Sequence, residues 1–144
     1  MKLEVTRLHP LAVVPAYAHA NDAGADLVSV DDVTIAHGGG RALVHTGWAL
    51  AIPDGFAGLV LPRSGNALRH GVTVMNAPGL IDAGYRGEIM VALINTDPTE
   101  DFHVAVGDRI AQLVLTATPQ WTFVENDELP TSVRGEHGFG STGR

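Results

Sequence analysis

Large residues alternate with small or polar ones along several short stretches of the chain. In residues 44–52 the even positions carry Val, Thr, Trp, Leu and Ile, whereas the odd positions carry His, Gly and Ala. Because successive side chains of a strand point to opposite faces, this period of two predicts a strand with one large-residue face. Residues 102–106 alternate in the same way, and the apolar runs 87–95 and 109–115 have the length of strands.

Clusters of Gly, Pro, Asn and Asp separate these stretches, as expected for tight turns. They read AHGGGR, IPDGF, NAPGLIDAGYRG, NTDPTED and VGD. Short strands with turn signals roughly every 8–12 residues predict an all-β fold, either a sandwich, a jelly roll or a barrel. Only residues 64–71 (SGNALRHG) have a helical pattern, which is long enough for one short helix.

The C-terminal part of the chain has a different character. The apolar alternation stops near Glu125, and the sequence after it is polar and rich in glycine. A chain of 144 residues has the size of one domain, so we expect a β-domain over residues 1–125 and a flexible arm over residues 126–144. Residues 138–143 read GxGxxG, the spacing of a dinucleotide-binding loop, but such a loop needs a helix after it. A glycine-rich tail is the alternative interpretation.

The charge balance excludes several classes of partner. The chain has 9 basic and 16 acidic residues, a net charge of −7, which argues against non-specific binding to nucleic acid or to an anionic membrane. The absence of cysteine excludes disulfides and thiolate chemistry, and the seven histidines form no HxH or HxxxH pair. Because the sequence shows no membrane-spanning run and no signal peptide, we expect a cytoplasmic protein.

Five segments, taken in order, carry a family resemblance. They are DAGADLVS (22–29), PRSGNALRHGV (62–72), NAPGLIDAGYRGEIMVALIN (76–95), GDRIAQLVL (107–115) and RGEHGFGSTGR (134–144). In this set the chain resembles the trimeric dUTP nucleotidohydrolases, or dUTPases. The resemblance implies a jelly-roll-like fold, a homotrimer with shared active sites, and Mg²⁺-dependent hydrolysis of dUTP to dUMP and pyrophosphate. That reaction keeps uracil out of DNA and supplies dUMP for thymidylate synthesis.

The third segment resembles the part of the family site that carries the chemistry. Asp82 matches the general base that activates the attacking water, a role that suits a carboxylate within hydrogen-bond reach of that water. Tyr85 matches the residue whose ring lies against the deoxyribose and excludes a 2′-hydroxyl, and Asn76 matches a residue that reads the uracil edge. Local sequence alone also fits a turn-forming Asp, a core-capping Tyr and a turn Asn.

Two other segments resemble the phosphate-binding part of the family site. Arg63 offers a guanidinium, and Ser64 and Gly65 match positions that contact the phosphate chain through a hydroxyl and backbone amides. Gln112 of the fourth segment matches a further phosphate contact. An N-cap role for Ser64 and a solvent-facing strand position for Gln112 are the alternatives.

The resemblance also implies a metal ion and a closing arm. A triphosphate usually binds with Mg²⁺, and Asp26 matches the family carboxylate that reaches this ion through water, with a strand-edge carboxylate as the alternative. The GxGxxG stretch resembles an arm that folds over the nucleotide. Its expected contacts are Phe139 with the uracil ring, backbone approach at Gly140, and γ-phosphate contacts from Arg134, Ser141 and Thr142.

Two other functions fit parts of the same pattern. A dCTP deaminase-like enzyme would carry a catalytic Glu in the third segment, where this chain has Ala92 and where Glu88 is the nearby alternative. A non-catalytic nucleotide-binding trimer would lose the base, whereas Asp82 and the arm are both present. The chain departs from the dUTPase pattern at Asn66, where the family usually has an aliphatic residue.

Overall fold

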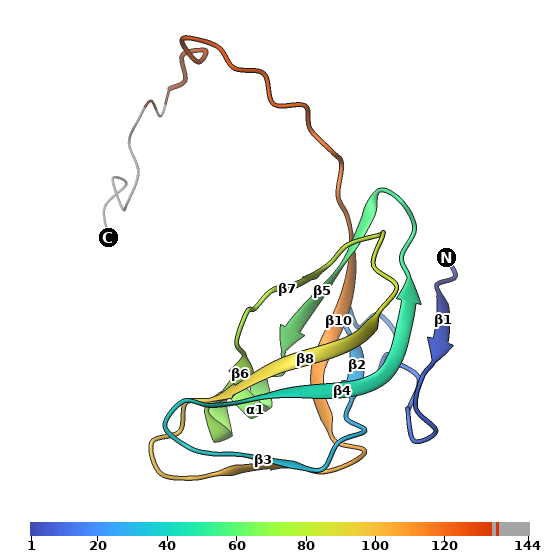
Figure 1. Ribbon diagram of the computed structural model, residues 1–144. Helices are drawn as coiled ribbons and strands as arrows, with labels where there is room; N and C mark the ends of the chain where they lie inside the picture. The colour runs from blue at the N-terminus through green and yellow to red at the C-terminus, as the bar shows by residue number, and fades with distance from the viewer. Residues whose placement is uncertain (134, 136–144) are drawn as a thin grey trace.

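The computed structural model describes residues 1–133 and 135, which form ten short strands and one helix (Figure 1). In chain order the elements are β1 (Glu4–Arg7), β2 (Ala25–Val28), β3 (Val33–Ile35), β4 (Gly40–Ala51), β5 (Phe56–Pro62), α1 (Ser64–His70), β6 (Val72–Val74), β7 (Gly79–Ile81), β8 (Glu88–Asn95), β9 (Phe102–Val104) and β10 (Arg109–Ala117). Within these described residues no helix has the length and apolarity needed to span a membrane.

Two four-stranded antiparallel sheets enclose the core. One has the strand order β1-β4-β8-β6 and the other the order β2-β10-β5-β7, while β3 and β9 form a separate pair. Val44 of β4 and Val91 of β8 belong to the same buried cluster as Leu27, Val60 and Leu113 of the second sheet. The two sheets therefore pack face to face, which is the all-β arrangement that the alternating pattern predicts.

The longest predicted strands are present, with small differences at their ends. Along β8 the side chains of Ile89, Val91 and Leu93 are buried and alternate with more exposed neighbours, as expected for a strand with one core face. The expected strand over 102–106 is shorter than predicted, because β9 ends at Val104 and Val106 is exposed. The expected helix is confirmed as α1.

A bulge in β4 overturns the expectation of one continuous large-residue face. The pairing of β4 with β8 shifts between His45 and Ala49, and Gly47 in this interval has a φ of +72°. Trp48 then leaves the main core and packs in a second cluster with Ala12 and Val30. Its indole nitrogen donates to a backbone carbonyl at 2.8 Å, so the Trp48 ring is both buried and hydrogen-bonded.

The chain leaves the sheets after β10. Residues 118–133 contain no helix or strand and extend away from the two sheets (Figure 1). Trp121 and Phe123 on this segment are 78% and 96% exposed. The division into a domain over 1–125 and an arm over 126–144 stays a prediction.

Candidate active site

A buried carboxylate lies between two arginines on the sheet that contains β2 and β10. Asp26 of β2 is 8% exposed and pairs in register with Gln112 of β10. Its Oδ1 lies 3.5 Å from Nε of Arg63 and 3.4 Å from Nε2 of Gln112, and its Oδ2 lies 3.3 Å from Nη1 of Arg109. Asp26 is therefore on an edge strand, as one interpretation of the sequence had it, but its side chain is buried.

Strand order brings this group together. Because β10 lies between β2 and β5, Arg63 at the end of β5 and Asp26 on β2 meet across it. Arg63 Nη1 also donates to the Arg109 carbonyl at 3.2 Å. Two guanidinium groups beside one carboxylate leave a local positive charge on an acidic protein, which suits phosphate oxygens.

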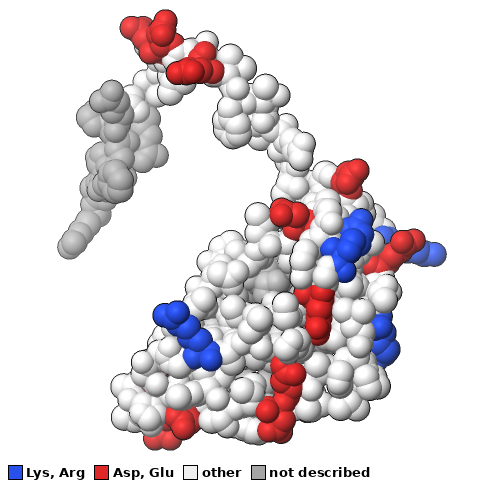
Figure 2. Space-filling view, viewed as in Figure 1, with Lys and Arg blue, Asp and Glu red and all other residues white. Residues whose placement is uncertain are grey.

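Arg109 is the residue of this group that sequence reasoning did not place in the site. The sequence feature that could have indicated a role for Arg109 is its position in the fourth segment, two residues after Gly107. Only the pairing of β2 with β10 shows that its side chain reaches Asp26. Figure 2 shows few Lys and Arg side chains on the visible face: one at the lower left surrounded by uncharged residues, and others on the right beside acidic side chains.

Ser64 and Gly65 form the first turn of α1. The N-cap of this helix is Arg63, and no side chain caps the helix, so the interpretation of Ser64 as an N-cap is wrong. The Ser64 side chain is exposed. A Cβ on Gly65 would lie 2.9 Å from Nη2 of Arg69, so a further guanidinium stands close to this turn.

The predicted base lies on a different part of the same chain. Asp82 follows β7, is exposed, and lines a shallow groove with Tyr85, Leu43 and Met90. The Tyr85 amide donates to the Asp82 carbonyl at 3.0 Å, which closes a turn between the two residues. Tyr85 is 42% exposed, so it does not cap the core, and its hydroxyl donates to the Glu88 carbonyl at 2.9 Å.

Asn76 lies in the loop between β6 and β7 and is exposed. Its amide stands beside Gly79, where an added Cβ would lie 3.4 Å from the Asn76 Nδ2. The loop and turn that flank β7 thus carry Asn76, Asp82 and Tyr85 together. Within residues 1–133 and 135, no hydrogen bond or ion pair joins these three residues to the group around Asp26. The remaining predicted site residues lie outside the described residues: Arg134, Phe139, Gly140, Ser141 and Thr142.

Glu88, the alternative base of a deaminase, has a structural contact. Its Oε1 accepts a hydrogen bond from the Gly47 amide at 2.8 Å, inside the β4 bulge. Glu88 therefore anchors the start of β8 to β4. The position of a deaminase Glu is occupied by Ala92, which has no ionisable side chain.

One ion pair away from these groups has shifted pKa values. The Nδ1 of His45 lies 2.8 Å from Oδ2 of Asp31, which also accepts from the His45 amide at 2.8 Å. Burial raises the pKa of Asp31, but the hydrogen bonds and charge of His45 outweigh this and the net pKa is lowered. The hydrogen bond to Asp31 raises the pKa of His45.

Comparisons with known proteins identify the family. Residues 11–143 match the family model described as dUTPase. A deoxyuridine 5'-triphosphate nucleotidohydrolase of Thermobifida fusca (strain YX) is 57% identical over 143 residues, which cover 99% of this chain and 79% of that protein. The protein of the same name from Leifsonia xyli subsp. xyli (strain CTCB07) is 52% identical over 130 residues, covering 90% of this chain and 85% of that one.

Solved structures agree with this match. The Staphylococcus bacteriophage 80alpha dUTPase with dUPNHPP has a TM-score of 0.92 and 29% sequence identity to this chain, over 99% of each chain. This likeness confirms the predicted jelly-roll-like fold with its one short helix. By its family model, its relatives and its fold, the chain belongs to the dUTPase family.

Proposed function

We propose that this chain hydrolyses dUTP to dUMP and pyrophosphate. The observation that carries the proposal is the exposed Asp82 carboxylate beside Tyr85 on one turn. Among the described residues, no hydrogen bond or ion pair engages this carboxylate, so it is free to bind and deprotonate a water. Family membership supports the substrate, because the relatives compared above are named for the hydrolysis of deoxyuridine triphosphate.

In this mechanism Asp82 acts as the general base. The carboxylate accepts a proton from water while the water oxygen bonds to phosphorus. The bond from that phosphorus to the leaving oxygen breaks, and pyrophosphate departs with the electron pair. The hydrogen bond from the Tyr85 amide to the Asp82 carbonyl fixes the backbone that carries this carboxylate, which supports the proposed role.

The group around Asp26 is the proposed phosphate site. Arg63 supplies positive charge, Ser64 and Gly65 present a hydroxyl and backbone amides from the first turn of α1, and Gln112 offers an amide. These groups would hold the triphosphate and neutralise the charge that develops as pyrophosphate leaves. Arg109 beside Asp26 adds a second guanidinium.

Mg²⁺ is the proposed cofactor, with Asp26 as its water-mediated protein contact. The D95N dUTPase of phage phi11 of S. aureus has been solved with a coordinated structural Mg(II) ion. The donor set of this chain fits an ion held mainly by phosphates: Asp26 is one buried carboxylate, and the described residues contain no cluster of three or more His, Cys, Asp or Glu that could hold a metal alone. Such an ion lowers the charge of the triphosphate.

Selection of the nucleotide is assigned to the loops around β7 and to the arm. The Tyr85 ring would contact the deoxyribose and reject a 2′-hydroxyl, and Asn76 would pair with the uracil edge. From the arm, Phe139 would stack on uracil, and Arg134, Ser141 and Thr142 would contact the γ-phosphate. Gly140 would let the backbone of the arm approach the ligand. We assign the boundary between domain and arm to residue 125.

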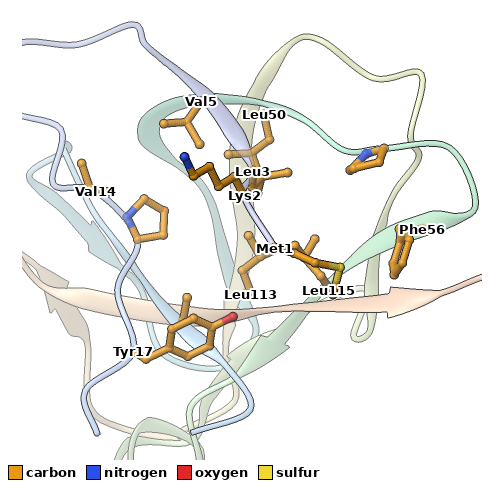
Figure 3. A pocket seen from close by; sticks show the side chains of 13 residues that line it. Met1, Lys2, Leu3, Val5, Val14, Tyr17, Leu50, Phe56, Leu113 and Leu115 are labelled. Atoms are coloured by element: carbon orange, nitrogen blue, oxygen red, sulfur yellow. The ribbon is translucent and has the colours of Figure 1, made fainter. Parts of the chain in front are cut away.

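A homotrimer with shared sites is the proposed assembly. Among the described residues of one chain, no hydrogen bond or ion pair joins the Asp82 turn to the Asp26 group, which supports a complete site built from residues of different copies. Two apolar surfaces of the chain are also exposed to solvent. One is a groove of about 520 Å³ beside β1, whose lining includes Val14, Tyr17, Phe56 and Leu115 (Figure 3). The other is the segment with Trp121, and contact between copies would bury both.

The test is pyrophosphate release from the purified protein with Mg²⁺ and dUTP, dCTP, dTTP or UTP. We expect release with dUTP alone and its loss on chelation of the metal. Asp82→Asn should lower turnover by roughly 10²–10⁴ while dUTP binding changes by less than about tenfold. Asp54→Asn is the matched control, because Asp54 is an exposed carboxylate that lines a second groove with Asp82. Near-normal turnover of Asp82→Asn would contradict the proposed base, and deamination of dCTP would contradict the reaction.

A further inference from the structure

We propose that Gly87 is a specificity-determining position of this chain, because only a residue without a Cβ lets the Tyr85 ring fold onto its own turn. The inference rests on the proposed function, in which that ring distinguishes deoxyribose from ribose. It concerns how the ring is held rather than what it contacts.

The evidence is a close approach between Tyr85 and the residue two positions later. A Cβ built on Gly87 would lie 2.6 Å from Cζ of Tyr85 and 3.0 Å from Cε2, and it would be closer still to the hydroxyl oxygen. Carbon atoms in contact stand about 3.5–4.0 Å apart. With any larger residue at position 87, the ring would therefore have to move by roughly 1 Å.

The same approach allows a hydrogen bond that fixes the ring. The Tyr85 hydroxyl donates to the Glu88 carbonyl at 2.9 Å. Glu88 in turn is held from two sides, because it pairs with Ala49 in the ladder of β4 and its carboxylate accepts from the Gly47 amide at 2.8 Å. The acceptor of the Tyr85 hydroxyl is thus part of the sheet, and the ring orientation is set by β4 and β8.

Three further hydrogen bonds hold the rest of the turn. The Tyr85 amide donates to the Asp82 carbonyl at 3.0 Å, and the Arg86 guanidinium donates to the Ala83 and Tyr85 carbonyls at 2.5 and 2.8 Å. Because these bonds fix the backbone conformation within the turn, the Tyr85 backbone cannot shift away from position 87 without breaking them. The ring itself has to give way.

The experiment compares two alanine substitutions in the same turn. Gly87→Ala adds the clashing Cβ, whereas Gly84→Ala is the matched control, since a Cβ on Gly84 meets nothing within 4 Å. The quantity measured is the ratio of kcat/KM for dUTP to kcat/KM for UTP. We expect this ratio to fall roughly 10- to 100-fold in Gly87→Ala and to stay near the starting value in Gly84→Ala.

A second variant tests the hydrogen bond without adding an atom. Tyr85→Phe keeps the ring and removes the hydroxyl, and we expect the dUTP to UTP ratio to fall by roughly 2- to 10-fold. A crystal structure of Gly87→Ala supplies a readout besides activity: the Tyr85 hydroxyl should stand beyond hydrogen-bond distance of the Glu88 carbonyl.

The outcomes separate this inference from the proposed function. If the unaltered protein hydrolyses dUTP and UTP equally, or Tyr85→Ala leaves the ratio unchanged, the proposed role of Tyr85 fails. If Tyr85→Ala lowers the ratio while Gly87→Ala and Tyr85→Phe do not, the proposed function stands and the role of Gly87 is overturned. Should Gly87→Ala not fold, an unchanged ratio in Tyr85→Phe overturns the inference by itself.

Discussion

Substituting alanine for Gly47 tests how much the β4 bulge contributes to the stability of the domain. Gly47 has a φ of +72°, a conformation that costs a residue with a Cβ about 1–2 kcal/mol. Its added Cβ would also lie 2.7 Å from Cβ of Ala12 and 2.8 Å from Cβ of His9, and overpacking of this kind costs about 1–3 kcal/mol. The two costs together are about 2–5 kcal/mol, which lowers Tm by roughly 5–15 °C in a protein of this size.

The matched control is Gly55→Ala. Gly55 has a similar φ of +80°, but a Cβ there meets nothing within 4 Å, so this variant carries the conformational cost without the clash. Urea unfolding of both variants at one protein concentration measures the difference, which we expect to be about 1–3 kcal/mol. Equal losses of stability in the two variants would refute the reasoning, because they would show that the Ala12 and His9 contacts at the bulge carry no cost.

Three other perturbations test one ion pair, one buried hydrogen-bonding side chain and the arm. Asp31→Asn keeps an acceptor for the His45 amide but removes the charge. Since the His45 pKa is raised and the Asp31 pKa is lowered, the pair stabilises the fold most between about pH 4 and 6.5 and fades as pH rises through the His45 pKa. Urea unfolding should therefore show a loss of about 0.2–1 kcal/mol at pH 5.5 and less at pH 8.5, and a loss that grows with pH would contradict this. Asn95→Ala removes a fully buried amide that bonds the Ile35 and Glu100 carbonyls, so calorimetry should show a loss of about 2–4 kcal/mol, and a loss below about 1 kcal/mol would rule out its structural role. Deletion of residues 135–144 should leave the Tm without nucleotide nearly unchanged and remove most activity, whereas a chain that no longer folds would show the tail to be structural.

The elements that the sequence predicts best are those with the longest regular patterns. Strands β8 and β10 lie inside their sheets and bury one face, so their apolar positions recur over seven residues or more and are visible without a structure. Strands β3, β6 and β7 have three residues each, too few to show a period. The β4 bulge is hidden for a different reason, because Gly47 fits the alternation as a small residue. Only the structure reveals the shift, through the pairing of β4 with β8 and the positive φ of Gly47.

In the candidate site, too, local patterns can be predicted from the sequence and contacts between distant segments cannot. Asp82 and Tyr85 belong to one turn, so a single motif predicts that they lie together. The approach of Arg109 to Asp26 depends on the register of β2 and β10, strands separated by most of the chain, and no local pattern records it. The close contact of Gly87 with Tyr85 cannot be predicted from the sequence either, because glycine occurs in turns for several different structural reasons.

The two tryptophans of the chain give it two separate optical probes. Trp48 is 4% exposed, beneath the Arg7 guanidinium, whereas Trp121 is 78% exposed on the segment that leaves the sheets. The emission maximum of Trp48 should lie at a short wavelength, and iodide should quench this emission little. The emission maximum of Trp121 should lie at a longer wavelength, and iodide should quench this emission readily. Unfolding of the domain and burial of the C-terminal segment can therefore be followed independently in the unlabelled protein, with Trp48→Phe and Trp121→Phe to assign each signal.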